Sequence, residues 1–91
     1  MAQTADRNIR IVSSSTIEER LSFQAQLDGK PADLFCSKLV PECVMVEPGE
    51  YLLVDAPADK QLYADCFNVY LYSYDKSHQR DKKIGLYCLL P

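Results

Sequence analysis

Apolar and polar residues alternate over much of the chain with the two-residue period of a β-strand. The clearest case is the segment 66–90, in which two alternating runs flank a charged loop centred near His78. Both runs are rich in aromatic and aliphatic residues, and the pattern predicts a long antiparallel hairpin. The apolar positions that define its two strands are Phe67, Val69 and Leu71 in the first and Ile84, Leu86, Cys88 and Leu90 in the second.

A second hairpin is predicted over residues 43–54. The uninterrupted apolar run 43–46 suits a buried strand, and 51–54 suits its partner. Pro48 and Gly49 lie between the two runs at the central positions of a turn. Glycine is favoured at the second of these positions in a type II turn because the backbone there needs positive φ.

The segment 16–27 allows two interpretations. As a helix, it would begin with a capping box formed by Thr16 and Glu19. As a strand, it would place Leu21, Phe23, Ala25 and Leu27 on one face, with polar residues between them. We favour the strand, because Asp28 and Gly29 follow it with the chemistry of a tight hairpin turn.

The remaining segments predict shorter elements. Residues 8–12 suit a short strand and 13–16 a loop, no period dominates at 32–41, and the linker 55–60 is followed by one helical turn at 61–65. About six or seven short strands with a turn signal roughly every ten residues are typical of a β-sandwich or a small barrel. We predict an all-β fold, a small antiparallel β-sandwich of the immunoglobulin-like kind.

Length and composition indicate one globular domain. The chain has 91 residues, of which 47% are hydrophobic and 25% charged. A second domain would be too small to bury a core of its own. We therefore assign one domain to residues 8–91 and expect a disordered tail at 1–7.

Two classes of protein are disfavoured by composition. No apolar run approaches the roughly 18 residues that a membrane-spanning helix needs. The formal net charge of −3 disfavours nucleic-acid binding, which depends on clustered Lys and Arg.

The four cysteines are the most informative part of the composition. An even number in a small chain predicts two disulfides formed in an oxidising compartment. In the 66–90 hairpin, Cys66 and Cys88 would lie nearly opposite one another, which leaves Cys36 to pair with Cys43. The competing arrangement pairs Cys36 with Cys66 and Cys43 with Cys88.

The amino terminus bears on the cellular compartment. It contains no apolar signal core, but Ala2-Gln3-Thr4-Ala5 resembles the end left by cleavage behind small residues, with Met1 added for expression. Together with the cysteines, this favours a secreted or periplasmic protein. The alternative is a cytoplasmic protein whose four thiols are reduced and buried.

No motif indicates catalysis, a cofactor or a metal. The cysteines are not spaced in the close pairs that structural zinc sites use. His78, the single histidine, is expected in an exposed charged loop, where it would be a poor general base. With three glycines in all, the chain has no glycine-rich phosphate loop. We therefore expect a protein that is not an enzyme and needs no cofactor.

Tyrosines in the 66–90 hairpin form the one candidate binding surface. Tyr70, Tyr72 and Tyr74 share a strand face because they are two residues apart, and Tyr87 is expected on or near that face. Cations at the predicted tip extend the candidate surface: Arg80, Lys82 and Lys83. Such a surface suits an acidic protein partner. The alternative is that the tyrosines only pack across the hairpin or beneath a loop.

These observations favour a small exported, disulfide-stabilised protein-binding module of an inhibitor, immunity or recognition type. A structural or accessory domain that pairs through an edge strand in a surface assembly is the second hypothesis. The third is a cytoplasmic anti-defence or regulatory protein with free thiols.

Overall fold

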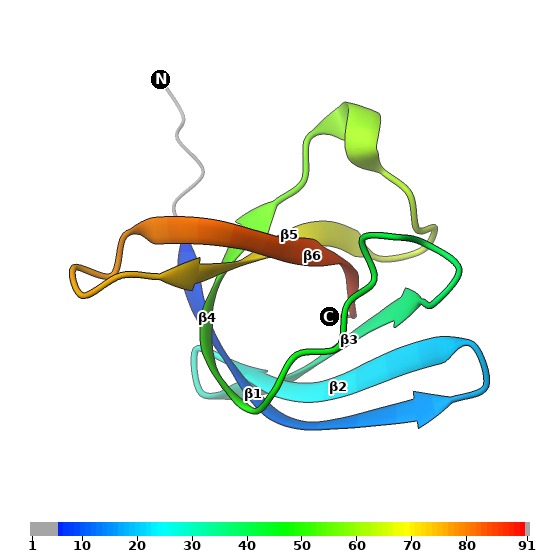
Figure 1. Ribbon diagram of the computed structural model, residues 1–91, viewed down its shortest axis with the longest axis horizontal. Coiled ribbons are helices and arrows are strands. Elements are labelled where there is room, and N and C mark those ends of the chain that lie inside the picture. The colour runs from blue at the N-terminus through cyan, green and yellow to red at the C-terminus, as the bar shows by residue number, and fades with distance from the viewer. Residues whose placement is uncertain (1–5, 91) are drawn as a thin grey trace.

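Six antiparallel strands form one sheet that closes on itself as a barrel, in the order β1-β2-β3-β6-β5-β4 (Figure 1). This computed structural model describes residues 6–90. Its elements are β1 (Arg7–Ile17), β2 (Arg20–Leu27), β3 (Lys30–Ser37), β4 (Gly49–Asp55), the short 3-10 helix η1 (Ala58–Lys60), β5 (Phe67–Tyr74) and β6 (Arg80–Leu90). The all-β fold predicted from the sequence is confirmed.

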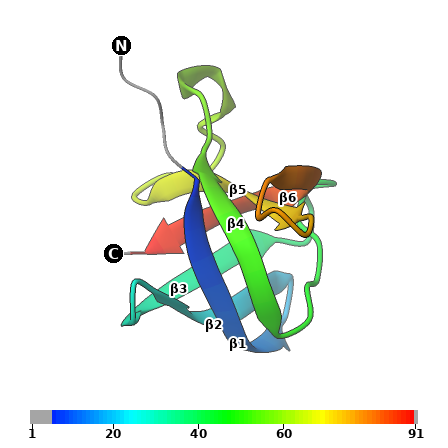
Figure 2. The same ribbon diagram turned by 90° about the vertical axis from the view of Figure 1, so that its left-hand side faces the viewer.

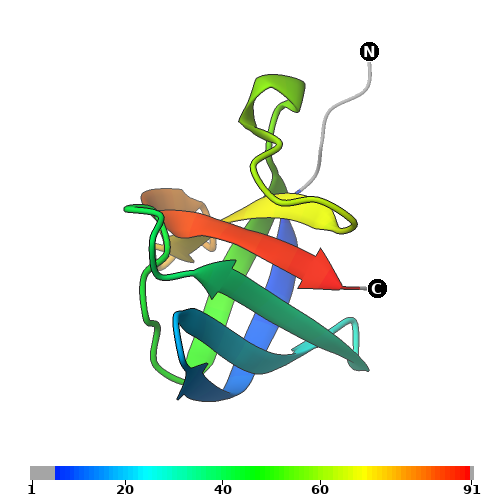
Figure 3. The same ribbon diagram turned by 90° about the vertical axis from the view of Figure 1, so that its right-hand side faces the viewer.

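Two three-stranded meanders make up the barrel, one of β1, β2 and β3 and the other of β4, β5 and β6. β1 pairs with β4 along residues 7–11, and β3 pairs with β6 along residues 33–35. Figure 2 shows β1 beside β4, and Figure 3 shows β3 beside β6. These two pairings join the meanders on both sides, so the strands form one closed sheet and not the two packed sheets of the predicted sandwich.

Two-residue turns connect β1 to β2 and β2 to β3. Asp28 and Gly29 both have positive φ, 55° and 76°, the conformation that this residue pair favours in a two-residue hairpin. The strand interpretation of residues 16–27 is confirmed, although a further turn at Glu18–Glu19 divides the segment. β1 also includes the serine-rich stretch that was predicted to be a loop.

The predicted hairpin over 43–54 is wrong. Its second strand exists as β4, but residues 43–48 are not a strand, and Pro48–Gly49 is not a hairpin turn. β4 instead pairs with β1 on one side and β5 on the other. Of the apolar run, Cys43 and Val46 pack against the core, whereas Val44 and Met45 are 39% and 46% exposed.

Residues 38–48 form a loop across one end of the barrel. The carbonyl of Glu42 accepts a hydrogen bond from the Leu86 N–H (2.9 Å), and the carbonyl of Val44 accepts one from the Tyr87 hydroxyl (2.7 Å). β6 therefore supplies hydrogen-bond donors to carbonyl groups of this loop, as a neighbouring strand would if the loop were part of the sheet.

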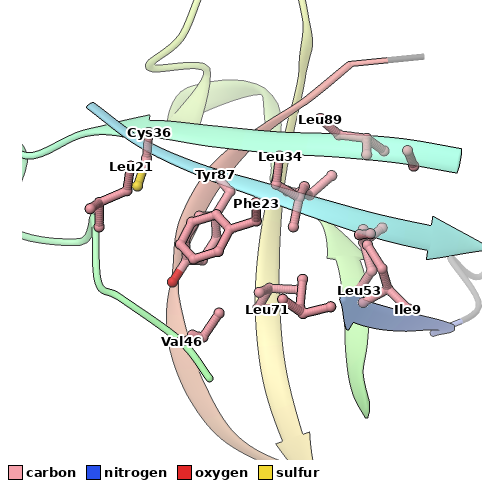
Figure 4. Packing of buried hydrophobic residues seen from close by; sticks show 14 residues of the cluster. Ile9, Leu21, Phe23, Leu34, Cys36, Val46, Leu53, Leu71, Tyr87 and Leu89 are labelled. Carbon is pink, nitrogen blue, oxygen red and sulfur yellow. The ribbon is translucent and has the colours of Figure 1, made fainter. Parts of the chain in front are cut away.

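Apolar side chains fill the inside of the barrel (Figure 4). The ring of Phe23 meets the ring of Tyr87 edge to face, with centroids 5.6 Å apart. The buried members of this core are Ile9, Ile11, Leu21, Phe23, Ala25, Ala32, Leu34, Cys36, Val46, Leu53, Val69, Leu71, Tyr87 and Leu89.

The inward face of β6 differs from the prediction. Val69 and Leu71 belong to the core as expected, but the residues opposite them on β6 are Tyr87 and Gly85. A bulge at Ile84 shifts the register, and a one-residue shift reverses which side chains face the core. Of the predicted β6 set, Ile84 packs against the core at the bulge, whereas alternation places Leu86, Cys88 and Leu90 on the outer side.

Both predicted disulfides are present. Cys36 is joined to Cys43 across a Cα–Cα distance of 5.5 Å, and Cys66 to Cys88 across 5.7 Å. The first connects the 38–48 loop to the inner side of β3. The second fixes the chain entering β5 onto β6, so each disulfide holds an irregular segment against the barrel.

The chain between β4 and β5 covers part of the outside of the barrel. Its helical turn is η1 at 58–60, not at 61–65 as predicted. The buried side chain of Asn68 holds this segment: its amide oxygen accepts the Tyr63 N–H (2.7 Å) and its amide nitrogen donates to the Tyr63 carbonyl (2.8 Å). Beneath lies a second apolar group, here called the outer cluster: Val54, Ala56, Tyr70 and Leu86, with Tyr63 and Tyr72 packed against them.

The prediction of a disordered tail at residues 1–7 is wrong for Arg7, and residues 1–5 lie outside the described part of the chain. Arg7 is the first residue of β1, and Asp6 forms an ion pair with Arg80.

Candidate functional site

The β5–β6 hairpin extends past the barrel and ends in a turn at residues 75–79 (Figure 1). A carboxylate oxygen of Asp75 accepts hydrogen bonds from the N–H groups of Ser77 (2.9 Å) and Gln79 (3.1 Å). His78 has φ 59°, and its N–H donates to the Asp75 carbonyl (3.0 Å). The predicted turn is confirmed at this place, and local hydrogen bonds define its shape.

Tyr70, Tyr72 and Tyr74 lie on one side of β5, each beside a basic or imidazole side chain of the return strand or the turn. The Lys83 ammonium lies 4.5 Å from the Tyr70 ring centroid, and the Arg80 guanidinium lies 5.1 Å from that of Tyr72. His78 stacks on Tyr74 with ring centroids 4.5 Å apart. Cations at these distances are attracted to the negative face of an aromatic ring.

Two acidic residues from other parts of the chain hold these cations in place. Asp6 receives two hydrogen bonds from the Arg80 guanidinium, and a Glu42 oxygen lies 3.6 Å from the Lys83 ammonium. The hydrogen bond from Arg80 lowers the pKa of the Asp6 carboxyl, and Asp6 in turn raises the pKa of Arg80. Both cations are therefore fixed over the tyrosines by charge as well as by the strand.

Exposure increases toward the tip of the hairpin. Tyr70 is 8% exposed and belongs to the outer cluster, where its role is structural. Tyr72 and Tyr74 are half-buried, and the turn beyond them is exposed. The accessible surface, here called the hairpin platform, consists of Tyr72, Tyr74, His78, Arg80 and Lys83.

Besides Tyr70, two further predicted members are not part of the platform. Tyr87 is 0% exposed and faces the core, because the bulge in β6 reverses its side. Lys82 lies next to Ser73, whose hydroxyl accepts a hydrogen bond from the Lys82 N–H (3.2 Å). Ser73 alternates with the tyrosines along β5 and therefore lies on the other face of the strand.

The sequence missed His78 and Asp6 as part of this site. The stacking of His78 depends on the turn returning its imidazole to the strand, which strand periodicity does not report. Asp6 meets Arg80 from 74 residues away along the chain. No local pattern signals such a contact.

A cleft of about 470 Å³ lies at the barrel end where β1, β3 and β5 begin. Leu27, Ala32 and Leu89 contribute apolar surface, and Phe67 is 59% exposed beside them. An ion pair between Arg7 and Asp55 (3.0 Å) also lines the cleft. The lining is mostly apolar, and Asp28 and Lys30 also contribute to it.

Within residues 6–90, no group of three or more potential metal-binding side chains comes together. The four cysteines are all in disulfides. In the same part of the chain, no helix has the length and apolar content required to cross a membrane.

No protein-family model, curated protein or solved structure gives a significant match to this chain.

Proposed function

We propose that this protein is a non-enzymatic, disulfide-stabilised binding module that recognises an acidic surface on another protein through the hairpin platform. The observation that carries the proposal is the row of tyrosines with cations fixed beside them, on a hairpin that extends past the barrel.

The platform has the composition of a recognition surface. Tyrosine and arginine are enriched at protein interfaces and at their energetic hot spots. Arg80 and Lys83 each lie beside one carboxylate of this chain, and their side chains remain 43% and 46% exposed. They can therefore take a further carboxylate from a partner, and the exposed parts of Tyr72 and Tyr74 supply apolar contact area next to them.

The platform is also fixed before binding. Asp75 fixes the turn, Asp6 and Glu42 hold the cations, and the Cys66–Cys88 disulfide anchors the opposite end of the hairpin. A surface with few rotors left to immobilise loses little conformational entropy on association. This is the property expected of an inhibitor, an immunity protein or another recognition domain.

Two disulfides are consistent with an oxidising, extracellular compartment. We accordingly propose that the protein works after export, in the periplasm or outside the cell.

The proposal is tested by affinity capture from extracts of the native host. The wild-type protein is compared with Tyr72→Ala/Tyr74→Ala and with Phe67→Ala, a control that removes an exposed aromatic side chain from the other end of β5. We expect the wild type and the control to capture the partner and the amount captured by the double variant to be at least tenfold lower. The double variant is expected to stay folded, with a modest decrease in melting temperature because Tyr72 also packs against the outer cluster. Equal capture by all three proteins would contradict the proposal.

A further inference from the structure

β1 extends past the strand that closes the barrel. Its pairing with β4 ends at Ile11↔Gly49, whereas its pairing with β2 continues to Ile17↔Arg20. Along residues 12–17, here called the β1 edge, one side of the strand has no neighbouring strand among residues 6–90. Apart from its ladder with β2, this stretch has no backbone hydrogen bond to another segment among residues 6–90.

The β1 edge lacks the features that usually prevent strand edges from pairing. Natural edge strands are protected by lysine, proline, inward-pointing charge or a β-bulge within the edge. The β1 edge reads Val-Ser-Ser-Ser-Thr-Ile, with neither charge nor proline. Val12 and Ile17, at its two ends, are 49% and 63% exposed. The bulge in β1 lies at the start of the edge, between Ile11 and Ser13, and leaves the rest continuous.

Charges flank the β1 edge in a self-complementary order. Arg10 precedes it and Glu18 and Glu19 follow it. The Arg10 guanidinium lies 3.7 Å from a Glu50 oxygen of β4, but its side chain is 61% exposed and can take a second carboxylate. If two copies pair antiparallel about a two-fold axis near the middle of the edge, Arg10 of each copy approaches Glu18 and Glu19 of the other. A parallel arrangement would bring Arg10 beside Arg10 and glutamate beside glutamate. The charge order therefore selects a second copy in antiparallel orientation.

We infer that this protein forms a two-fold homodimer in which the β1 edges of two copies pair antiparallel, joining the two β1-β2-β3 meanders into one continuous sheet. In Figure 1 the β1–β2 tip and the hairpin platform lie toward opposite ends of the longest axis. The dimer thus leaves both platforms accessible. This inference does not rest on the proposed function, because it concerns a different surface.

The test is sedimentation equilibrium from about 10 µM to 1 mM, a range chosen because pairing along one short edge buries little area. Arg10→Glu and Glu18→Arg/Glu19→Arg each place like charges together, and we expect each to weaken dimerisation at least tenfold. The combined variant Arg10→Glu/Glu18→Arg/Glu19→Arg restores opposite charges, and we expect its dissociation constant to return to within about threefold of wild type. Lys60→Glu on η1 makes the same change in net charge as Arg10→Glu and serves as the control.

A second variant does not involve the turn at Glu18–Glu19. Ser15→Lys places two lysines near the two-fold axis, and we expect it to be monomeric with an unchanged melting temperature. A wild-type protein that remains monomeric at 1 mM would overturn the inference. So would a dimer that neither Arg10→Glu nor Ser15→Lys weakens, or a folded combined variant that stays monomeric.

Discussion

At the scale of single residues, Tyr87 connects the core to the loop that covers the barrel end. Its ring packs against Phe23, and its hydroxyl donates to the Val44 carbonyl. Burial raises the pKa of this phenol well above its ordinary value of about 10. The buried hydroxyl needs its partner, because an unpaired polar group in the core would be costly.

We predict that Tyr87→Phe lowers the free energy of unfolding by about 1 kcal/mol at neutral pH, through loss of the hydrogen bond to Val44. The raised pKa of Tyr87 also makes stability depend on alkaline pH. Its contribution is complete below the unfolded-state pKa near 10 and is lost as the pH rises above it, because the unfolded tyrosine then ionises while the folded one stays neutral.

The phenylalanine variant should therefore lose stability less steeply above pH 10. Burial also raises the pKa values of Tyr51 and Tyr63, which remain in the variant, so a shallower slope is expected and not a flat one. Urea unfolding of both proteins between pH 7 and pH 11 measures this difference. If the unfolding free energies of the two proteins decreased in parallel between pH 7 and pH 11, Tyr87 would not be the source of the alkaline pH dependence.

At the scale of elements, the sequence was most informative where neighbouring segments pair. The alternation in 66–74 and the turn at Asp28–Gly29 identify β5 and the β2–β3 hairpin, because strand period and turn chemistry are local properties. The prediction of a disulfide between Cys66 and Cys88 followed from the same local hairpin, although the register places Asn68 opposite Cys88.

Other features depended on contacts that local patterns do not contain. The bulge at Ile84 moves Tyr87 from the predicted surface into the core, and nothing in the alternation marks where a bulge falls. The apolar run 43–46 resembles a strand in the sequence, but it is part of a loop in which Cys43 and Val46 pack against the core and Val44 and Met45 are exposed. Whether the strands close into a barrel depends on the β1–β4 and β3–β6 pairings, which join distant segments.

At the scale of elements, we predict how removal of the Cys66–Cys88 disulfide changes stability. We expect Cys88→Ser to lower the free energy of unfolding of the oxidised protein by about 2–5 kcal/mol, as loss of a native disulfide does in small domains. Cys88 is fully buried, so the change also removes a well-packed sulfur. Denaturant unfolding under oxidising conditions measures the difference, and a decrease below about 0.5 kcal/mol would contradict the structural role given to this disulfide.

At the scale of the whole molecule, the barrel is a rigid support for two separate surfaces. The disulfides and the core fix the strands, the hairpin platform lies toward one end of the longest axis, and the β1 edge extends toward the other. A dimer through the β1 edge would present two platforms, so a partner with repeated acidic sites would be bound with avidity. Neither surface requires the barrel to change shape.

The most direct test of the binding account is the affinity of the captured partner for two matched arginine variants. Arg80 lies over the Tyr72 ring on the platform, and Arg20 lies 4.0 Å from the Phe35 ring centroid on another part of the barrel. Both substitutions to alanine remove an arginine from an aromatic ring. The account predicts that Arg80→Ala raises the dissociation constant at least tenfold, whereas Arg20→Ala leaves it within about twofold of wild type. Equal dissociation constants for the two variants would contradict it.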